Sequence, residues 1–223
     1  MARIARVIAP GFPHHITQRG NRRMPTFFRN EDYEAYIALL AEWCRTCRVE
    51  VWAYCLMPNH VHLIAVPETL EGLRQAIGEA HRRYTRMINS RSGWSGHLWQ
   101  GRFASFVMDE SYLLAATRYV ELNPVRAGLT ADPFAWRWSS AAAHLAGQDD
   151  SLVKVAPLLE MVGDWRQFLL ESPANDMMND LRKHERTGRP LGRESFLQRL
   201  ENTLSRVLRK QKPGPKGKTV IIK

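Results

Sequence analysis

Hydrophobic positions along the chain follow two patterns, and the shorter, β-branched or alternating runs predict strands. The segment HHITQRGN (14–21) alternates Ile16 with polar neighbours and ends at a Gly-Asn pair, which predicts a strand followed by a turn. The runs VEVWAYCLM (49–57) and HVHLIAVP (60–67) are separated only by a Pro-Asn pair, so they predict a hairpin. A fourth strand is predicted in RFASFVMD (102–109).

Longer segments between these runs carry apolar residues at helical spacing. The segment 30–47 predicts an amphipathic helix, with Asn30 as its N-cap and two acidic residues in its first turn. A second helix is expected from about Glu68 to Asn89. Asp109 or Ser111 can cap a third helix that runs to Asn123, because the following proline disfavours helical geometry in the residue before it.

The order of these elements is strand, helix, strand, strand, helix, strand, helix. This order predicts an α+β fold, a ferredoxin-like β-α-β-β-α-β sheet with an added helix. We expect this first unit to span residues 1–145 and a helical, basic extension to span 146–223. The segment KQKPGPKGK (210–218) is rich enough in Pro, Gly and Lys to be disordered on its own.

The composition narrows the class of protein and its location. The chain has 223 residues, of which 44% are hydrophobic and 24% charged, an ordinary globular balance. No apolar run is long enough to span a membrane, and the N-terminus lacks the apolar core of a signal peptide, so a cytoplasmic location is expected. Three cysteines are too few and too clustered for a disulfide framework and are expected to be reduced.

The formal net charge is +10, and all of the excess lies near the C-terminus. Residues 1–181 contain equal numbers of basic and acidic side chains, whereas residues 182–223 contain 13 basic and 3 acidic ones. A basic segment of this kind indicates a polyanionic partner, since each cation that neutralises a phosphate releases a counterion. A solvated tail that only aids solubility is the alternative. The segments TGRPLG (187–192) and KPGPKGK (212–218) also resemble short minor-groove contacts.

Two histidines, His60 and His62, interrupt the otherwise apolar hairpin. Alternation along a strand places both on one face, with Cβ atoms about 6–7 Å apart, while Val61, Leu63 and Ala65 occupy the opposite face. Two imidazoles at this spacing can share one metal ion or one phosphate. The alternative, two hydrogen-bonded histidines with a purely structural role, is less expected for a pair on one face.

A third group for such a site is predicted on the helix that precedes Pro124. Tyr112, Ala116, Tyr119 and Asn123 fall on one helix face, so the Tyr119 phenol and the Asn123 amide are neighbours about one turn apart. A tyrosine on a helix face is usually part of the core or its rim. The spacing alone therefore leaves the role of Tyr119 open.

Basic and aromatic side chains are interleaved between Glu79 and Asp109, where no acidic residue occurs. Arginines for the phosphate backbone and flat rings for bases are typical of single-stranded nucleic-acid binding. The tryptophans of this segment could instead anchor a loop on the sheet. With a second basic patch in QRGNRR, the candidate nucleic-acid-binding residues are Arg19, Arg22, Arg23, Arg82, Arg83, Arg86, Trp99 and Arg102.

Several motifs in a fixed order resemble one known family. The segments ITQRGNRR, MPNHVHLIAVP, GHLWQGRF, RYVELNPVRAGL and WRWSS, spanning about residues 10–143, are similar to the REP-associated tyrosine transposases, a branch of the single-tyrosine HUH transposases. Family members often end soon after the last motif, whereas this chain continues, so the resemblance implies nothing for the extension.

The resemblance implies a transposase-type enzyme that cleaves and joins single-stranded DNA of hairpin-forming palindromic repeats without ATP. It implies that His60, His62 and Asn123 hold the metal and that Tyr119 is the nucleophile of a 5′-phosphotyrosine intermediate. It also implies Mg²⁺ or Mn²⁺, although imidazole ligands by themselves suit zinc, copper or nickel better. A nucleoid-associated protein, either monomer or homodimer, is expected.

Three other functions remain open from the sequence. The spacing of Cys44, Cys47, His60 and His62 could form a zinc site, although finger-type sites separate their histidines by more residues. A non-catalytic regulator on the same fold could bind the same hairpins. RNA binding on a four-stranded sheet is a third alternative, but its exposed aromatic signature is absent from the strands.

Overall fold

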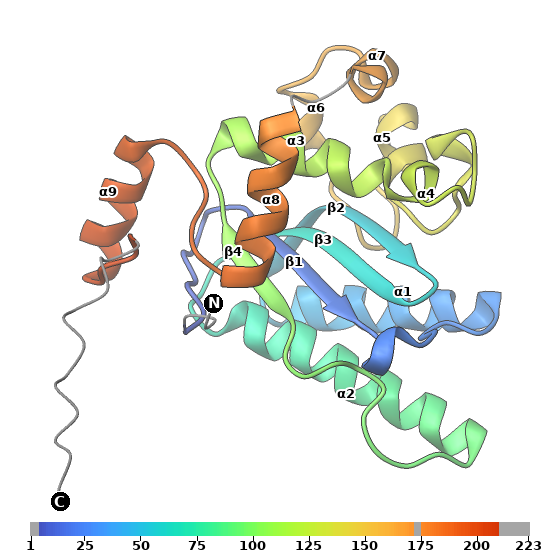
Figure 1. The fold of residues 1–223 in the computed structure, drawn as a ribbon. Helices are drawn as coiled ribbons and strands as arrows, with labels where there is room; N and C mark the ends of the chain where they lie inside the picture. The colour runs from blue at the N-terminus through green and yellow to red at the C-terminus, as the bar shows by residue number, and fades with distance from the viewer. Residues whose placement is uncertain (1–4, 172–174, 210–223) are drawn as a thin grey trace, which may run out of the picture.

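A four-stranded antiparallel sheet forms the centre of the molecule in a computed structural model that describes residues 5–171 and 175–209. Its strands are β1 (His14–Arg19), β2 (Val49–Met57), β3 (His60–Pro67) and β4 (Ala104–Val107), in the order β2-β3-β1-β4 (Figure 1). Every neighbouring pair is antiparallel. The predicted hairpin, strand succession and ferredoxin-like α+β fold are therefore confirmed.

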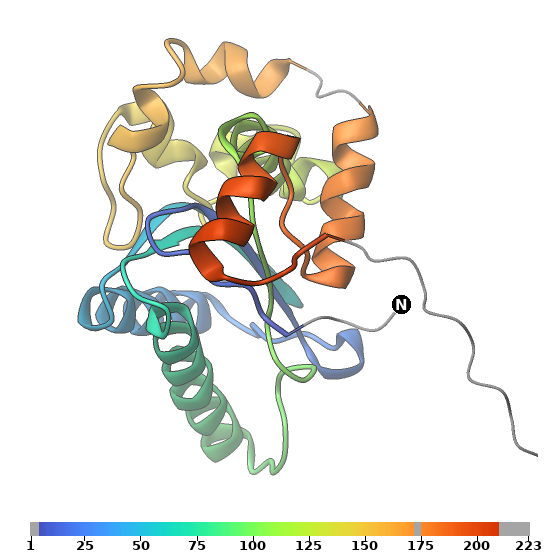
Figure 2. The same ribbon diagram turned by 90° about the vertical axis from the view of Figure 1, so that its left-hand side faces the viewer.

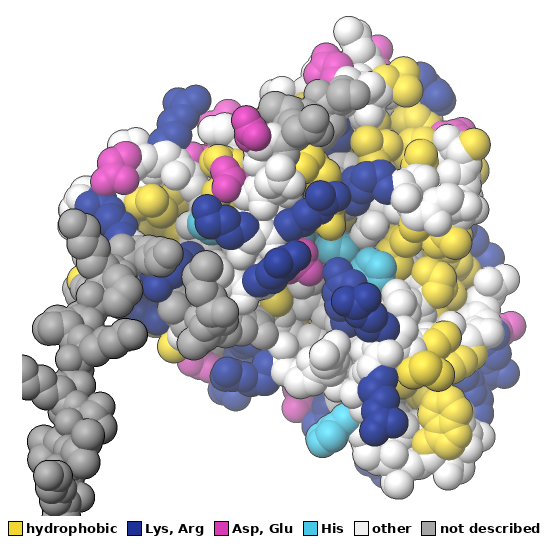
Figure 3. All heavy atoms as spheres, in the orientation of Figure 1, with side chains coloured by type: hydrophobic (Ala, Val, Ile, Leu, Met, Phe, Trp, Pro, Cys, Tyr) yellow, Lys and Arg dark blue, Asp and Glu magenta, His cyan; other side chains and the backbone are white. Residues whose placement is uncertain are grey.

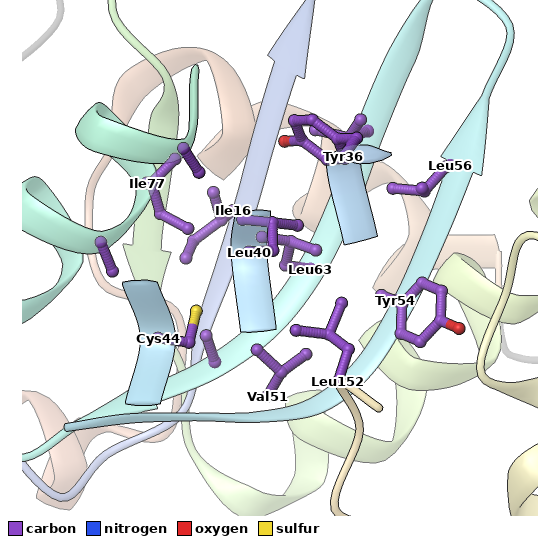
Figure 4. Packing of buried hydrophobic residues seen from close by; sticks show 14 of the residues in the cluster. Ile16, Tyr36, Leu40, Cys44, Val51, Tyr54, Leu56, Leu63, Ile77 and Leu152 are labelled. Carbon is purple, nitrogen blue, oxygen red and sulfur yellow. The ribbon is translucent and has the colours of Figure 1, made fainter. Parts of the chain in front are cut away.

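One face of the sheet is covered by α1 (Asn30–Thr46) and α2 (Gly72–Ser92), which lie side by side below it in Figures 1 and 2. Val61, Leu63 and Ala65 of β3 point into this layer and are fully buried, as predicted. Leu40 of α1 and Ile77 of α2 pack among them (Figure 4). This is the larger apolar core, and alternation along β3 leaves its histidines on the other face.

The opposite face is covered by α3 (Glu110–Glu121), with α8 (Asn175–Thr187) beside it (Figure 1). Ile64 and Phe106 of the sheet pack there against Leu113 and Tyr119 of α3 and Leu181 of α8. The histidine face of the sheet is thus a second core, and only its margin reaches solvent.

The predicted start of the third helix is confirmed, whereas the predicted cap of the first helix and the predicted end of the third are corrected. Asp109 caps α3, where its side chain accepts a 3.1 Å hydrogen bond from the Tyr112 N–H. Asn30 is already the first residue of α1 rather than its cap, and the Asp32 carboxylate accepts the Phe28 N–H instead. The third helix ends at Glu121, two residues before Asn123.

The rest of the chain forms short elements that connect or flank these layers. They are η1 (Asn21–Arg23), α4 (Asn123–Arg126), η2 (Pro133–Ala135), α5 (Ala141–Ala146), α6 (Ala156–Leu159), α7 (Trp165–Leu170) and α9 (Glu194–Leu204). Pro124 lies in the first turn of α4, where its missing N–H costs nothing, so a new helix begins where α3 has ended.

The extension beyond residue 145 packs on the sheet unit. Val153 forms an isolated bridge with Val51 of β2, and Leu191 forms one with Met108 next to β4. Trp165 donates a 2.9 Å hydrogen bond to Glu121 at the end of α3. Within the described ranges, none of the helices is both long and apolar enough to cross a membrane.

Candidate active site and nucleic-acid interface

His60, His62 and Tyr119 converge at the end of β3 nearest the β2–β3 turn. The rings of His60 and His62 have centroids 5.1 Å apart, and the Tyr119 ring stands nearly perpendicular to His62 at 5.6 Å. β3 supplies the histidines from below and α3 supplies the phenol from above. All three side chains come from one chain.

Asn123 joins this group from the start of α4. Its Nδ2 lies 3.4 Å from His60 Nε2, and the residue is 9% exposed. A half-turn of the amide exchanges its nitrogen and oxygen, so either atom can face the same point. The structure therefore brings together the four residues that the sequence singled out, even though Asn123 and Tyr119 lie on two successive helices.

The protonation of His60 follows from its neighbours. Asn59 Nδ2 donates a 3.0 Å hydrogen bond to the Arg23 carbonyl, which turns Asn59 Oδ1 toward His60 Nδ1 at 2.6 Å. Because Oδ1 can only accept, the proton of the neutral His60 ring lies on Nδ1. The lone pair of His60 is then on Nε2, on the side of Asn123.

His62 is held through its other nitrogen. Its Nδ1 lies 3.0 Å from Nε2 of His15 on β1. Its Nε2 is buried and has no hydrogen-bond partner among the described residues. A buried imidazole nitrogen without a partner costs free energy unless something occupies that position, so His62 Nε2 is a candidate ligand atom.

Burial keeps these rings neutral. It lowers the pKa of His60 to about 4, with a further contribution from the charge of Arg19. Desolvation also lowers the pKa of His62 well below its usual value, and neighbouring His15, His60, Arg19 and Arg126 act in the same direction. At neutral pH both rings can therefore offer a lone pair.

These residues fit a divalent cation that takes most of its ligands from its substrate. Two imidazole nitrogens and one amide are available, and no group of three or more His, Cys, Asp or Glu side chains within residues 5–171 and 175–209 is placed to hold a metal. Two imidazoles and one amide would leave the remaining coordination positions of a bound ion open to other oxygen ligands.

The zinc alternative is wrong. Cys44 is buried in the core between α1 and the sheet, on the face opposite to His62. Burial also raises the pKa of the Cys44 thiol to about 12, which disfavours the thiolate that zinc binds. Cys44 and Cys47 are therefore separated from His60 and His62 by the sheet.

Tyr119 and Tyr112 occupy different surroundings, although both lie on α3. The guanidinium of Arg126 lies over the Tyr119 ring and interacts with its side chain. The Tyr112 hydroxyl donates a 3.3 Å hydrogen bond to Asp180 of α8. Tyr112 is therefore tethered to the extension, whereas Tyr119 faces the histidines.

The basic residues of QRGNRR lie next to this site. Arg19 ends β1 directly opposite His60 in the sheet register, and Arg22 and Arg23 are exposed in η1. Backbone hydrogen bonds join this turn to the β2–β3 turn and to the loop after α2, from Gly20 to Asn59 and from Asn21 to Leu98. Figure 3 shows Lys and Arg side chains gathered around histidines on this side of the molecule.

The arginines of α2 lie on the far side of the sheet from Tyr119. Arg82 and Arg83 both pair with Glu79, at 2.6 and 3.8 Å, and Arg86 is exposed. Arg82 and Arg102 line a hollow of about 560 Å³ between α2 and the loop that follows it. The two predicted basic patches are thus connected through this loop, but only the QRGNRR patch adjoins the histidines.

Trp99 is a core residue and cannot serve as a stacking platform in this conformation. It is 7% exposed, and its ring stacks on His81 with centroids 4.6 Å apart. Trp94 is 52% exposed and lies edge-on to the exposed Phe28. These two rings border a hollow of about 240 Å³ that Arg22 also lines. The exposed tryptophan of this segment is therefore Trp94 and not the predicted Trp99.

The basic extension is partly folded onto the site. Exposed Arg182, Lys183 and Arg186 lie on α8, and Glu185 of the same helix pairs with Arg19 at 3.7 Å. The arginine of TGRPLG is not a free contact, because Arg189 donates a 2.6 Å hydrogen bond to the Leu208 carbonyl. The segment KPGPKGK, with the disorder predicted for it, lies outside the described residues.

Two residues of the site were not predicted. His15 looked like one polar position of an alternating strand, and only the pairing of β1 with β3 brings it to His62. Arg126 follows the Asn-Pro pair in sequence, and the turn from α3 into α4 returns it to Tyr119. The only sequence signal for either residue was its position: His15 directly precedes ITQRGNRR, and Arg126 lies within RYVELNPVRAGL.

Comparisons with known proteins agree with this geometry. A family model described as "Transposase IS200 like" matches residues 11–123, just over half of the chain. No curated protein matches. A solved structure of a REP-associated tyrosine transposase bound to a REP hairpin is similar at a TM-score of 0.54 and 21% identity, and the match covers 68% of this chain and 90% of that one.

A second solved structure, described as a candidate transposase from Deinococcus radiodurans R1, is similar at a TM-score of 0.39 and 18% identity over 54% of this chain and 96% of that one. The first of these likenesses supports the fold, and the family model supports the membership. The matched region contains the paired histidines and the tyrosine that faces them. The chain therefore belongs to the IS200-like transposase family.

Proposed function

We propose that this protein is a metal-dependent single-strand DNA endonuclease and strand transferase that cleaves hairpin-forming repeat DNA through Tyr119. The observation that carries the proposal is the convergence of Tyr119, His60, His62 and Asn123 in one chain of a transposase family.

The reaction is a transesterification at phosphorus. The Tyr119 oxygen attacks the scissile phosphate and forms a P–O bond, while the bond from phosphorus to the 3′ oxygen breaks. The phenolic proton leaves during attack, and the departing 3′ oxygen takes up a proton to become a hydroxyl. The product is a 5′-phosphotyrosine, which retains the energy of the broken ester, so that joining to a second 3′-hydroxyl needs no ATP.

His60, His62 and Asn123 would hold Mg²⁺ or Mn²⁺ next to this phosphate. The ion, when bound, polarises the phosphate and offsets the charge that develops on the leaving oxygen. The neutral rings present lone pairs, and Tyr119 of α3 faces them, so a phosphate bound to the ion would lie near the phenol. Because one chain supplies every group, a monomer would be sufficient for the chemistry.

The DNA partner is proposed to be a hairpin with a single-stranded flank. The relative solved at 21% identity is bound to a REP hairpin, which is a property of that protein. In this chain, Arg19, Arg22 and Arg23 lie at the site, and Trp94 with Phe28 offers exposed rings beside them. Arginines for phosphates and rings for bases suit an unpaired strand that leads to Tyr119.

The proposal is tested with an end-labelled single-stranded hairpin that carries flanking sequence, incubated with Mg²⁺ or Mn²⁺ and run on a denaturing gel. We expect a heat-stable protein–DNA adduct with the wild type and none with Tyr119→Phe. Cleavage that survives in Tyr119→Phe overturns the assignment of the nucleophile.

Tyr112→Phe is the matched control, since it removes a hydroxyl from the same helix that binds Asp180 instead. It should still form the adduct. Tight hairpin binding without any adduct, with either metal, would favour the alternative function, a regulator that binds DNA on the same fold without cutting it.

A further inference from the structure

His15 is placed at His62 by the pairing of β1 with β3. In that register His15 lies opposite Ile64 and Thr17 lies opposite His62, so the two histidines are diagonal neighbours on the same face of the sheet. His15 is 1% exposed, and its ring plane is within 7° of the plane of His62. His15 Nε2 and His62 Nδ1 lie 3.0 Å apart and form a hydrogen bond.

Two arrangements of the proton are possible in this bond. If His15 Nε2 donates, the neutral His62 ring carries its own proton on Nε2 and has no lone pair to offer there. If His62 Nδ1 donates, the lone pair of His62 lies on Nε2, the buried atom without a partner. Only the second arrangement lets His62 act as a ligand together with Nε2 of His60.

Different partners determine which ring nitrogen carries the proton in His60 and in His62. Asn59 Oδ1 can only accept, so it fixes the His60 proton on Nδ1 without help. Among the described residues, the partner of His62 Nδ1 is His15 rather than a carboxylate, amide or carbonyl oxygen. The orientation of the second imidazole therefore depends on one histidine of β1.

The ring of His15 is held where it can serve this purpose. Phe106 meets it edge-on at 5.2 Å and Tyr119 at 6.1 Å. His15 Nδ1 is buried and has no partner within the described ranges, so the bond to His62 is the hydrogen bond that sets the direction of the ring. The same ring contacts the proposed nucleophile.

We infer that His15 is a positioning residue of the cation site, which accepts the Nδ1–H of His62 and so keeps the Nε2 lone pair of His62 directed at a divalent ion. The inference rests on the proposed function only in taking His62 as a ligand. A partner on the outer nitrogen of a ligating histidine is worth about 10- to 100-fold in metal affinity.

The experiment measures Mn²⁺ binding to the full chain, without and with bound hairpin DNA, by electron paramagnetic resonance of the free ion. His15→Gln places an amide oxygen at about the reach of Nε2 and can still accept from His62. His15→Phe fills similar space but cannot accept. His14→Gln is the matched control, because His14 is equally buried on β1 but contacts Phe12 and Ala9 instead.

We expect His15→Phe to weaken Mn²⁺ binding by about 10- to 100-fold, with His15→Gln and His14→Gln each within about threefold of the wild type. Hairpin affinity in chelator should change little in all three. Equal Mn²⁺ affinity of His15→Phe and wild type overturns the inference, as does an equal loss in the Phe and Gln variants.

A second measurement covers the case in which His15→Phe does not fold. In ¹⁵N-histidine-labelled wild type with saturating Mg²⁺, the ring signals of His62 should show a protonated Nδ1 and an unprotonated Nε2. A protonated Nε2 of His62 would overturn the inference. A wild type that binds no Mn²⁺ even with DNA instead contradicts the proposed metal dependence, so the two failures are distinguishable.

Discussion

The guanidinium of Arg126 lies over the ring of Tyr119, with Cζ 4.0 Å from the ring centroid, while its Nη2 donates a 2.7 Å hydrogen bond to the Tyr119 carbonyl. The two contacts hold the phenol between α4 and the histidines of β3. They also place a permanent positive charge beside the oxygen that would attack a phosphate.

Arg126→Ala should therefore slow cleavage. A cation–π contact is worth about 0.5–2 kcal/mol, which corresponds to a loss of roughly 2- to 30-fold in the single-turnover rate. Arg126→Lys should recover part of this, since it keeps the charge but not the planar group. An Arg126→Ala enzyme that cleaves at the wild-type rate would show that the contact only fills space.

His60→Ala should abolish cleavage and leave hairpin affinity within a few fold. The substitution removes one proposed ligand at the margin of the site, while the neighbouring arginines that face the phosphate backbone remain. Binding is measured by gel shift in chelator and cleavage on a denaturing gel across a Mn²⁺ titration. Cleavage that returns to the wild-type rate at high Mn²⁺ would reduce His60 to a weak ligand.

Glu121 anchors the C-terminal end of α3 from inside the protein. It is fully buried, and its carboxylate accepts hydrogen bonds from Ser140 at 2.5 Å, His144 at 2.7 Å and Trp165 at 2.9 Å. Through this residue the helix of Tyr119 is tied to α5 and α7 of the following segments.

Glu121→Ala should lower the free energy of unfolding by about 3 kcal/mol or more, because it leaves buried donors without an acceptor. Urea unfolding followed by circular dichroism measures this loss. Glu121→Gln keeps one carbonyl acceptor and should be less destabilising. Equal stability of the alanine variant and the wild type would mean that α3 is held by apolar packing alone.

Acid should destabilise the fold through its buried histidines. Burial lowers the pKa of His14 to about 4 and that of His15 and His81 to about 3. Below pH 6.5 the unfolded chain takes up protons that the folded chain does not, so stability is complete above that pH and is lost as the pH falls toward 3.

His81→Phe isolates one of these contributions away from the cation site, since His81 of α2 shares a 2.8 Å hydrogen bond with the hydroxyl of Tyr36 of α1. The variant should lose about 1 kcal/mol at pH 7 with that hydrogen bond. Between pH 6 and pH 4 its stability should fall less steeply than that of the wild type, by about 1.4 kcal/mol per pH unit. Parallel slopes would place the protonation elsewhere.

The basic residues of the extension should contribute to the salt dependence of DNA binding. Replacing Arg182, Lys183 and Arg186 of α8 by glutamine should flatten the slope of log K against log salt by up to about 0.7–0.9 per lost phosphate contact. Deleting residues 210–223 removes five lysines without touching the described fold and is the companion variant. A slope unchanged in both would exclude the extension as a major DNA contact.

The sequence by itself determined the strands and the first helices of this protein. It also determined which face of β3 carries the histidines. Periodicity gave the four strands and the first three helices near their true ends. Alternation along β3 put His60 and His62 together and Val61, Leu63 and Ala65 opposite. These are local properties, because side-chain direction within an element follows from backbone geometry alone.

The tertiary structure decided which segments meet. The register between β1 and β3 brings His15 to His62, the turn into α4 returns Arg126 to Tyr119, and packing on His81 buries Trp99 while Trp94 stays exposed. Each of these contacts joins positions whose partners depend on how separate elements pack. Neither propensity nor period along the chain encodes that packing, so only the folded arrangement reveals it.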